Sequence, residues 1–135
     1  MTHETRRAGR VAGCLMVTVA AFQGALALGA PWGEAAYGGA TVGVLGAQQR
    51  ISSAVAVPVY LAIAAVADGR VGSTAVRRRF LRAASAVMAV GSLVNLASPS
   101  LVERVIWVPV TVVATIALWR AAPGAPDAPS EPAVA

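Results

Sequence analysis

Four long runs of uncharged residues constrain what this chain can fold into. They cover Val11–Gly33, Ile51–Ala67, Ala83–Val102 and Val105–Trp119. A helix needs about 20 mostly apolar residues, with a range of about 17–25, to cross a bilayer. The first three runs have this length, and the fourth reaches it when the helix begins at Leu101 with its charged residues at the membrane surface. A soluble bundle would place polar residues every few positions on its outer faces, so the sequence predicts an all-α membrane protein.

The expected architecture is a four-transmembrane-helix bundle with both termini cytoplasmic. Residues 1–10 are predicted to be a cytoplasmic tail, and the helices to cover about residues 11–30, 51–67, 80–97 and 101–119. Residues 31–49 then form a long outer loop, and Ser98–Ser100 form a short outer turn. Residues 120–135 are rich in Pro and Ala, a composition typical of disordered chain, and are predicted to be a second cytoplasmic tail.

The placement of Arg predicts the orientation. All eleven basic residues are Arg. Nine fall on one side of the predicted membrane: Arg6, Arg7, Arg10, Arg70, Arg77, Arg78, Arg79, Arg82 and Arg120. Positive residues stay on the cytoplasmic side, so this side is predicted to be the cytoplasm, and the membrane to be a bacterial cytoplasmic (inner) membrane. A basic run such as residues 77–82 also suits anionic lipid or nucleic acid, but we interpret it as a topology determinant.

The predicted spans contain few groups suited to catalysis or ion coupling. No Asp, Glu, His, Lys or Arg falls at the middle of a span, where ion-coupled transporters and proton relays need one. One Cys and one His make no cluster of metal ligands, so no cofactor is expected. Small and polar residues on the helices have two interpretations. One is simple bundle packing, and the other is a polar cavity near Gln23, Tyr60 and Asn95.

Polar and aromatic residues gather in the two outer segments. The predicted cluster consists of Trp32, Gly33, Glu34, Gly38, Gly39, Arg50, Asn95, Ser98, Ser100, Glu103, Arg104 and Trp107. Opposite charges within about 4–6 Å favour the ionised forms. We therefore expect Glu34 to pair with Arg104 or Arg50, and Glu103 to pair with Arg50. Such pairs would staple the two outer segments together, whereas a docking surface for a ligand or partner is the alternative interpretation.

Two of these segments carry a resemblance to a known family. "PWGEAAYGG" in the first, Arg50 with "SSA", and "NLASPSLVERVIWVP" in the second resemble a family of small bacterial four-helix integral membrane proteins. Its members share a Pro-Trp-Gly-Glu outer loop and a Ser- and Glu-Arg-containing pattern that leads into the last helix. The resemblance spans about Gly24 to Trp119. It implies the four-helix fold, and it implies no particular activity.

Three classes of function fit these observations. The first is a non-enzymatic accessory or structural protein with an outer-face interaction surface, which contacts the lipid bilayer and a membrane-protein partner or a second copy of itself. The second is a small oligomeric transporter or channel for a neutral or lipid-like solute. The third is a lipid-acting enzyme that uses Glu34 or Glu103 as acid or base, and it is disfavoured because a carboxylate beside Arg suits an ion pair better. No nucleic-acid partner is expected.

Overall fold

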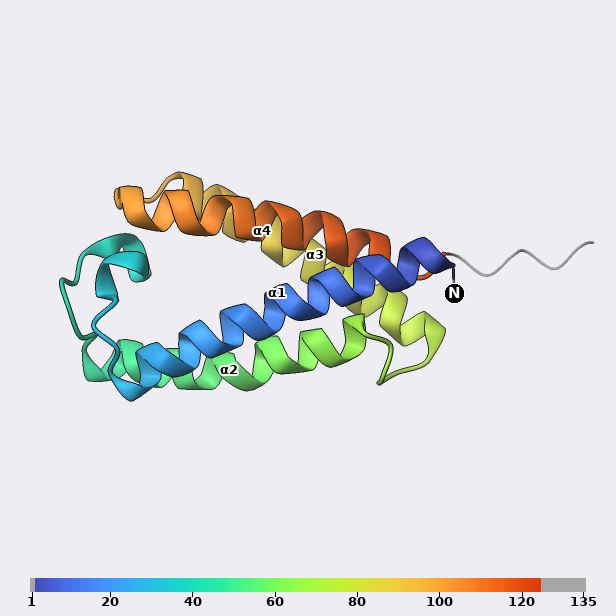
Figure 1. Cartoon of the computed structure of the whole chain (residues 1–135), viewed down its shortest axis with the longest axis horizontal. Helices are drawn as coiled ribbons and strands as arrows, with labels where there is room; N and C mark the ends of the chain where they lie inside the picture. The colour runs from blue at the N-terminus through green and yellow to red at the C-terminus, as the bar shows by residue number, and fades with distance from the viewer. Residues whose placement is uncertain (1, 125–135) are drawn as a thin grey trace, which may run out of the picture.

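The computed structural model describes residues 2–124, which form four long helices and two short 3₁₀ turns. The elements are α1 (His3–Leu28), η1 (Gly33–Ala35), η2 (Tyr37–Gly39), α2 (Ala47–Ala67), α3 (Thr74–Leu96) and α4 (Leu101–Ala121). The start of α1, the α2–α3 connection and the end of α4 lie at one end of the bundle, here called the basic end. Residues 29–46 and 97–100 lie at the other end, the loop end (Figure 1).

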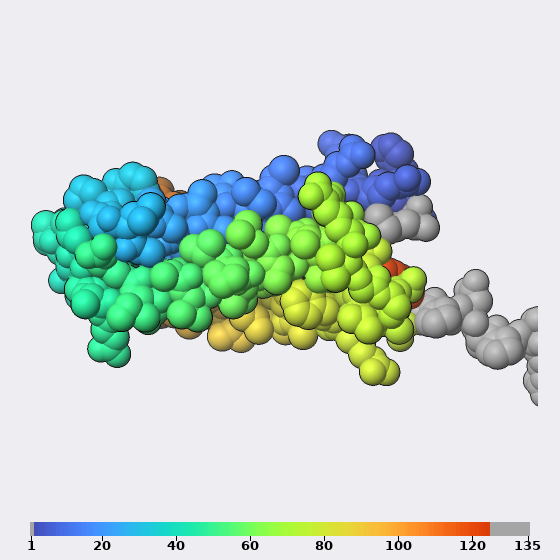
Figure 2. All heavy atoms as spheres, turned by 90° about the horizontal axis from the view of Figure 1, so that it is seen from below, coloured from blue at the N-terminus to red at the C-terminus, as the bar shows by residue number. Residues whose placement is uncertain are grey.

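The helices pack as two antiparallel hairpins. α1 packs along α2, α3 packs along α4, and the hairpins meet mainly through α1 and α4. α2 and α3 touch each other little, although Figure 2 shows α2 between α1 and α3 on one face of the molecule. The side of the bundle between α2 and α3 is therefore its most loosely packed side.

Small residues let the helices approach closely in the basic half of the bundle. Ala12 of α1, Ala67 of α2 and Ala121 of α4 have no exposed surface, and Met16 and Leu118 fill the space between them. Membrane helices associate through such close van der Waals packing, because lipid gives no hydrophobic drive between them. The continuous core therefore lies towards the basic end, and a separate small cluster of Leu26, Ala36 and Leu45 lies under the loops.

Three of the four helices, α1, α2 and α4, are long and apolar enough to cross a membrane. α3 is less apolar because its first turns carry Arg77, Arg78, Arg79 and Arg82. The prediction of an all-helical bundle with membrane-length apolar helices is thus confirmed for α1, α2 and α4. α3 has 23 residues, so its length matches that of the others even though its composition differs.

Two helices begin earlier than the sequence interpretation placed them. α1 begins at His3 rather than near Val11, and the hydroxyl of Thr2 accepts a hydrogen bond of 3.2 Å from the backbone N–H of Thr5. α3 begins at Thr74 rather than near residue 80, where the Ser73 hydroxyl caps it. The predicted start near Val11 is wrong because a charge ends an apolar run but does not end a helix. Arg is itself a good helix former.

The other boundaries differ by smaller amounts. α2 begins at Ala47 instead of residue 51 and ends at Ala67, as predicted. α4 continues to Ala121, so residues 120 and 121 are helical and do not belong to a tail. The remainder of the predicted disordered tail, residues 125–135, lies outside the described residues.

The arginines predicted to set topology also make specific contacts at the basic end. Arg77 is buried, and its Nε donates a hydrogen bond of 3.1 Å to the carbonyl of Val66. The guanidinium of Arg82 lies 4.0 Å from the ring centre of Trp119, within the range of a cation–π interaction. These contacts join α3 to the end of α2 and to α4, so two of the four arginines contribute to packing as well as to charge.

Candidate functional site

The first outer segment folds back onto the start of α4. We call residues 32–39 in this position the loop clasp. Ser100 donates its hydroxyl to the carbonyl of Glu34 at 2.7 Å, and the indole Nε1 of Trp107 donates to the carbonyl of Ala35 at 2.7 Å. The backbone N–H of Gly38 donates to Oε1 of Glu103 at 3.3 Å. Three side chains of the α4 segment therefore bind the backbone of the loop clasp.

Glu103 is the buried centre of these contacts. Its Oε2 accepts a short hydrogen bond from the hydroxyl of Ser98, and its Oε1 accepts the bond from Gly38. The hydroxyl of Ser100 also accepts from the backbone N–H of Glu103 at 3.2 Å, which caps α4. A buried carboxylate whose two oxygens both accept hydrogen bonds from the surrounding chain serves the fold.

Two glycines allow the loop clasp to lie this close. A Cβ at Gly33 would stand 2.5 Å from the carbonyl oxygen of Thr41 and 2.8 Å from that of Gly43. Gly39 has φ +68°, and a Cβ there would collide with the Cβ of Ser100. Only glycine fits where the backbone approaches its neighbours this closely and adopts positive φ without strain.

The loop clasp also reaches α2 and α1. The hydroxyl of Tyr37 lies 3.0 Å from that of Ser53 and donates to the carbonyl of Gln49 at 3.1 Å. On the α1 side, the ring of Phe22 stacks on Trp32, with centroids 5.9 Å apart, and meets Trp107 edge-on at 4.6 Å. Such ring pairs contribute about 0.5–1.5 kcal/mol beyond the area they bury. The clasp therefore joins three helices at the loop end.

The predicted ion pairs in this region are wrong. Glu34 and Arg104 are exposed, and Arg50 donates from Nε to the carbonyl of Ala27 at 3.0 Å. Within the described part of the chain, Asp68 and Arg70 form an ion pair at 2.8 Å, and it lies at the basic end. The clasp is held through backbone carbonyls, which sequence alone does not place. The Arg50 side chain reaches from α2 to the C-terminal end of α1, where unpaired backbone carbonyls need a donor.

A cavity of about 510 Å³ lies beneath the loop clasp. It is lined by Met16, Val19, Phe22 and Gln23 of α1, Ala35, Ala36 and Tyr37 of the loop, Ala56 and Tyr60 of α2, Val87, Met88, Val90, Gly91, Val94 and Asn95 of α3, and Glu103, Trp107, Val110, Thr111 and Ala114 of α4. All four helices contribute to its wall, and the loop clasp closes one end. Its volume is within the range of about 300–1,000 Å³ that is typical of small-molecule sites.

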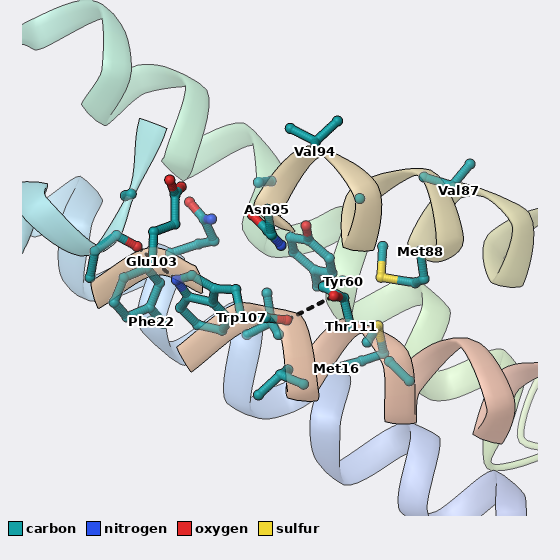
Figure 3. A pocket seen from close by; sticks show the side chains of 18 of the residues that line it. Met16, Phe22, Tyr60, Val87, Met88, Val94, Asn95, Glu103, Trp107 and Thr111 are labelled. Carbon is teal, nitrogen blue, oxygen red and sulfur yellow. Dashed lines mark hydrogen bonds between the residues drawn. The ribbon is translucent and has the colours of Figure 1, made fainter. Parts of the chain in front are cut away.

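The wall is mostly apolar but carries three polar side chains without partners. Among residues 2–124, the side chains of Gln23, Tyr60 and Asn95 form no hydrogen bond, and Oε1 of Gln23 is buried. Figure 3 shows the Asn95 amide and the Tyr60 phenol on the same part of the cavity wall. Thr111 is different, because its hydroxyl donates to the carbonyl of Trp107 at 2.7 Å.

The structure divides the predicted cluster into two groups. Most of its residues meet in or beside the loop clasp, whereas Asn95 lies in the cavity wall with Gln23 and Tyr60. A cavity lined by these three residues is present, although its wall is mostly apolar rather than polar as the sequence interpretation suggested. The sequence interpretation did not assign a role to Phe22 or Thr111. Phe22 gave no signal, since one aromatic residue in an apolar run resembles any other core residue.

The site contains few groups with chemical reactivity. In residues 2–124, no three His, Cys, Asp or Glu side chains lie together so that they could hold a metal ion. Glu103 is the carboxylate in the cavity wall, and its two oxygens accept hydrogen bonds from Gly38 and Ser98. No family model, curated protein or solved structure matches the chain.

Proposed function

We propose that this chain is a four-pass integral membrane protein of a bacterial cytoplasmic membrane, with both termini in the cytoplasm. α3 has 23 residues, compared with 26, 21 and 21 for α1, α2 and α4, and it is the hairpin partner of α4. Its arginines lie at the basic end, and the stretch that follows is uncharged from Ala83 to Val102. α3 can thus cross the membrane with its charged turns at the cytoplasmic surface, in line with the positive-inside rule. The family resemblance found in the sequence is consistent with this topology.

Within that fold, the protein binds a small, neutral, lipid-like molecule in the cavity under the loop clasp, without catalysing a reaction on it. The observation that carries this proposal is a mostly apolar cavity lined by Gln23, Tyr60 and Asn95, whose side chains make no hydrogen bond within residues 2–124; Oε1 of Gln23 is buried as well as unpartnered. Buried polar groups in proteins are nearly always hydrogen-bonded. An apolar pocket with a few convergent polar groups is the usual form of a ligand site.

The lining argues for a neutral ligand. No Arg or Lys is among the described residues that line the cavity, so an anion would have no counter-charge there. Both oxygens of Glu103 already accept hydrogen bonds from Gly38 and Ser98, and these bonds partly offset its negative charge, so a cation is less favoured there.

The ligand reaches the cavity from the bilayer between α2 and α3. These two helices touch each other little, and the loop clasp covers the cavity at the loop end. A lateral opening suits a molecule that partitions into lipid, because it never has to leave the apolar phase. This arrangement favours a transporter or carrier of a lipid-like solute over the docking of a partner on the clasp, whose backbone groups are already engaged within the chain.

An accessory role is the second candidate, and the exposed part of the first loop favours it. Val42, Val44 and Trp32 have exposed fractions of 81%, 51% and 49%. Apolar side chains gathered beyond the clasp would suit a second membrane protein at the outer surface. Photo-crosslinking from position 32 in native membranes tests this role. A discrete protein adduct supports it, and adducts to lipid alone count against it.

Filling the cavity tests the binding function. Gly91 of α3 lines the cavity, and a Cβ there would meet nothing within 4 Å, so Gly91→Leu is the filling variant and Gly91→Ala is the matched control. A helix interior gains about 1 kcal/mol when Gly is replaced by Ala, so both variants should fold. Ala56→Phe fills the cavity from the α2 wall.

We expect native mass spectrometry of protein extracted in mild detergent to show a bound small molecule in the wild type and in Gly91→Ala. Gly91→Leu and Ala56→Phe should lose it while retaining their helical circular dichroism. A wild type without any bound molecule, or a bound molecule that persists in both filled variants, would overturn the proposal.

A further inference from the structure

The hydrogen-bonding groups of the cavity specify the polar end of its ligand. We infer that the occupant is a neutral lipid alcohol, whose hydroxyl hydrogen is donated to Oε1 of Gln23. This inference rests on the proposed binding function. The oxygen is buried and has no partner in residues 2–124. A buried acceptor without a donor costs about 1–3 kcal/mol, and a ligand that supplies the donor removes that cost.

The other polar groups exclude most neutral alternatives. An ester, ketone or ether only accepts hydrogen bonds, so it would leave Oε1 of Gln23 without a partner. An alkane would leave Asn95 and Tyr60 without partners as well. A hydroxyl donates one hydrogen bond and accepts two, so it supplies the donor that the Gln23 oxygen needs and keeps lone pairs that can accept from a polar group of the same wall. Among uncharged single groups, it fits the wall best.

The remaining wall fits a hydrocarbon body. Met16 and Met88 lie beyond Tyr60 along the cavity, and Phe22 and Trp107 lie towards the loop clasp (Figure 3). Methionine is flexible and polarizable, and it adapts to irregular apolar shapes. We therefore expect the site to discriminate strongly between polar ends and weakly between hydrocarbon bodies of similar volume.

The experiment compares two probes that differ in one hydrogen-bond donor. Hexadecan-1-ol and its methyl ether are titrated into the protein in phospholipid nanodiscs, and the bound fraction is read by native mass spectrometry. Palmitate serves as the anionic probe of similar chain length. The variant is Gln23→Met, which keeps an unbranched side chain of similar size without the amide. The matched control is Gln48→Met, because Gln48 is exposed at the start of α2.

We expect the wild type and Gln48→Met to bind the alcohol about tenfold more tightly than the ether, and palmitate more weakly still; tenfold corresponds to about 1.4 kcal/mol. Gln23→Met should bind the alcohol and the ether equally. Equal binding of the two by the wild type would overturn the hydroxyl assignment and leave the proposed binding function intact. Preference for palmitate would overturn neutrality. A wild type that binds none of the probes, and that carries no bound small molecule in mild detergent, as expected for Gly91→Leu, would overturn both proposals.

Discussion

The indole N–H of Trp107 donates a hydrogen bond of 2.7 Å to the backbone carbonyl of Ala35, 72 residues earlier in the chain. This bond joins the second turn of α4 to the loop clasp and stands at the wall of the cavity. Phe22 of α1 packs edge-on against the same indole. One side chain thus links the first hairpin, the clasp and the second hairpin, and both the stability of the fold and the shape of the cavity depend on it.

Replacing Trp107 by Phe keeps an aromatic ring but removes the donor. The carbonyl of Ala35 is then buried without its partner, so we expect the free energy of unfolding to fall by about 1–3 kcal/mol. The measurement is denaturant unfolding in detergent micelles followed by circular dichroism. Trp32→Phe is the control, because the Trp32 ring stacks on Phe22 but its indole N–H makes no hydrogen bond within residues 2–124. Equal losses in the two variants would show that the hydrogen bond does not hold the clasp.

The close approach of Gly39 to Ser100 is tested by Gly39→Ala. Gly38 and Gly39 both have positive φ, at +80° and +68°, but a Cβ at Gly38 would meet nothing within 4 Å. Gly38→Ala should therefore cost about 1–2 kcal/mol of left-handed backbone strain alone. Gly39→Ala should cost clearly more, because the new methyl group collides with Ser100. Thermal unfolding of both variants measures the difference, and a smaller loss in Gly39→Ala would contradict the packing described.

The two carboxylates of the loop end should respond differently to neutralisation. Glu103 is buried and accepts hydrogen bonds at both oxygens, so Glu103→Gln replaces one acceptor by a donor that faces another donor. We expect a loss of about 1–3 kcal/mol in the free energy of unfolding. Glu34 is exposed, so Glu34→Gln should change stability by less than about 0.5 kcal/mol. Unfolding curves of the pair, measured side by side, would refute this assignment if Glu34→Gln proved the more damaging change.

The proposed topology predicts which positions a membrane-impermeant maleimide reaches. In a Cys14→Ser background, single cysteines replace Val42 and Pro99 at the loop end and Val71 at the basic end. All three positions are exposed. In intact cells, we expect labelling at 42 and 99, and labelling at 71 only after permeabilisation. Labelling at 42 together with protection at 99 in intact cells would show that α3 does not cross the membrane, since residues 71 and 99 would then share a side.

The fold class could be read from the sequence because it depends on local composition. Uncharged runs of membrane length predict helices, since only a helix satisfies its own backbone in lipid. The gathering of nine arginines predicted which segments share an end of the bundle. Helix starts were less accessible, because capping by Thr2 and Ser73 decides them and the charged turns beyond the apolar runs are helical too.

The contents of the loop end could be predicted only as a list of residues. Sequence identified Trp107, Glu103, Ser100 and the glycines as a group, but it paired carboxylates with arginines. The structure pairs side chains with backbone carbonyls of the loop clasp instead. Every residue has a carbonyl, so sequence gives no signal for which one an indole or hydroxyl meets. Which carbonyl is met depends on how the loop folds back onto α4. The positive φ of Gly39 and its close approach to Ser100 determine that fold.

The cavity shows the same division between local and tertiary information. Sequence alone determined that α1, α2 and α4 are apolar enough for a membrane and that Gln23, Tyr60 and Asn95 are polar residues within helical segments. Only the tertiary structure decided that these three face one space, because the facing depends on the rotation of each helix and on the sparse contact between α2 and α3. Rotation and spacing arise from packing between distant segments, and no local pattern in the chain records them.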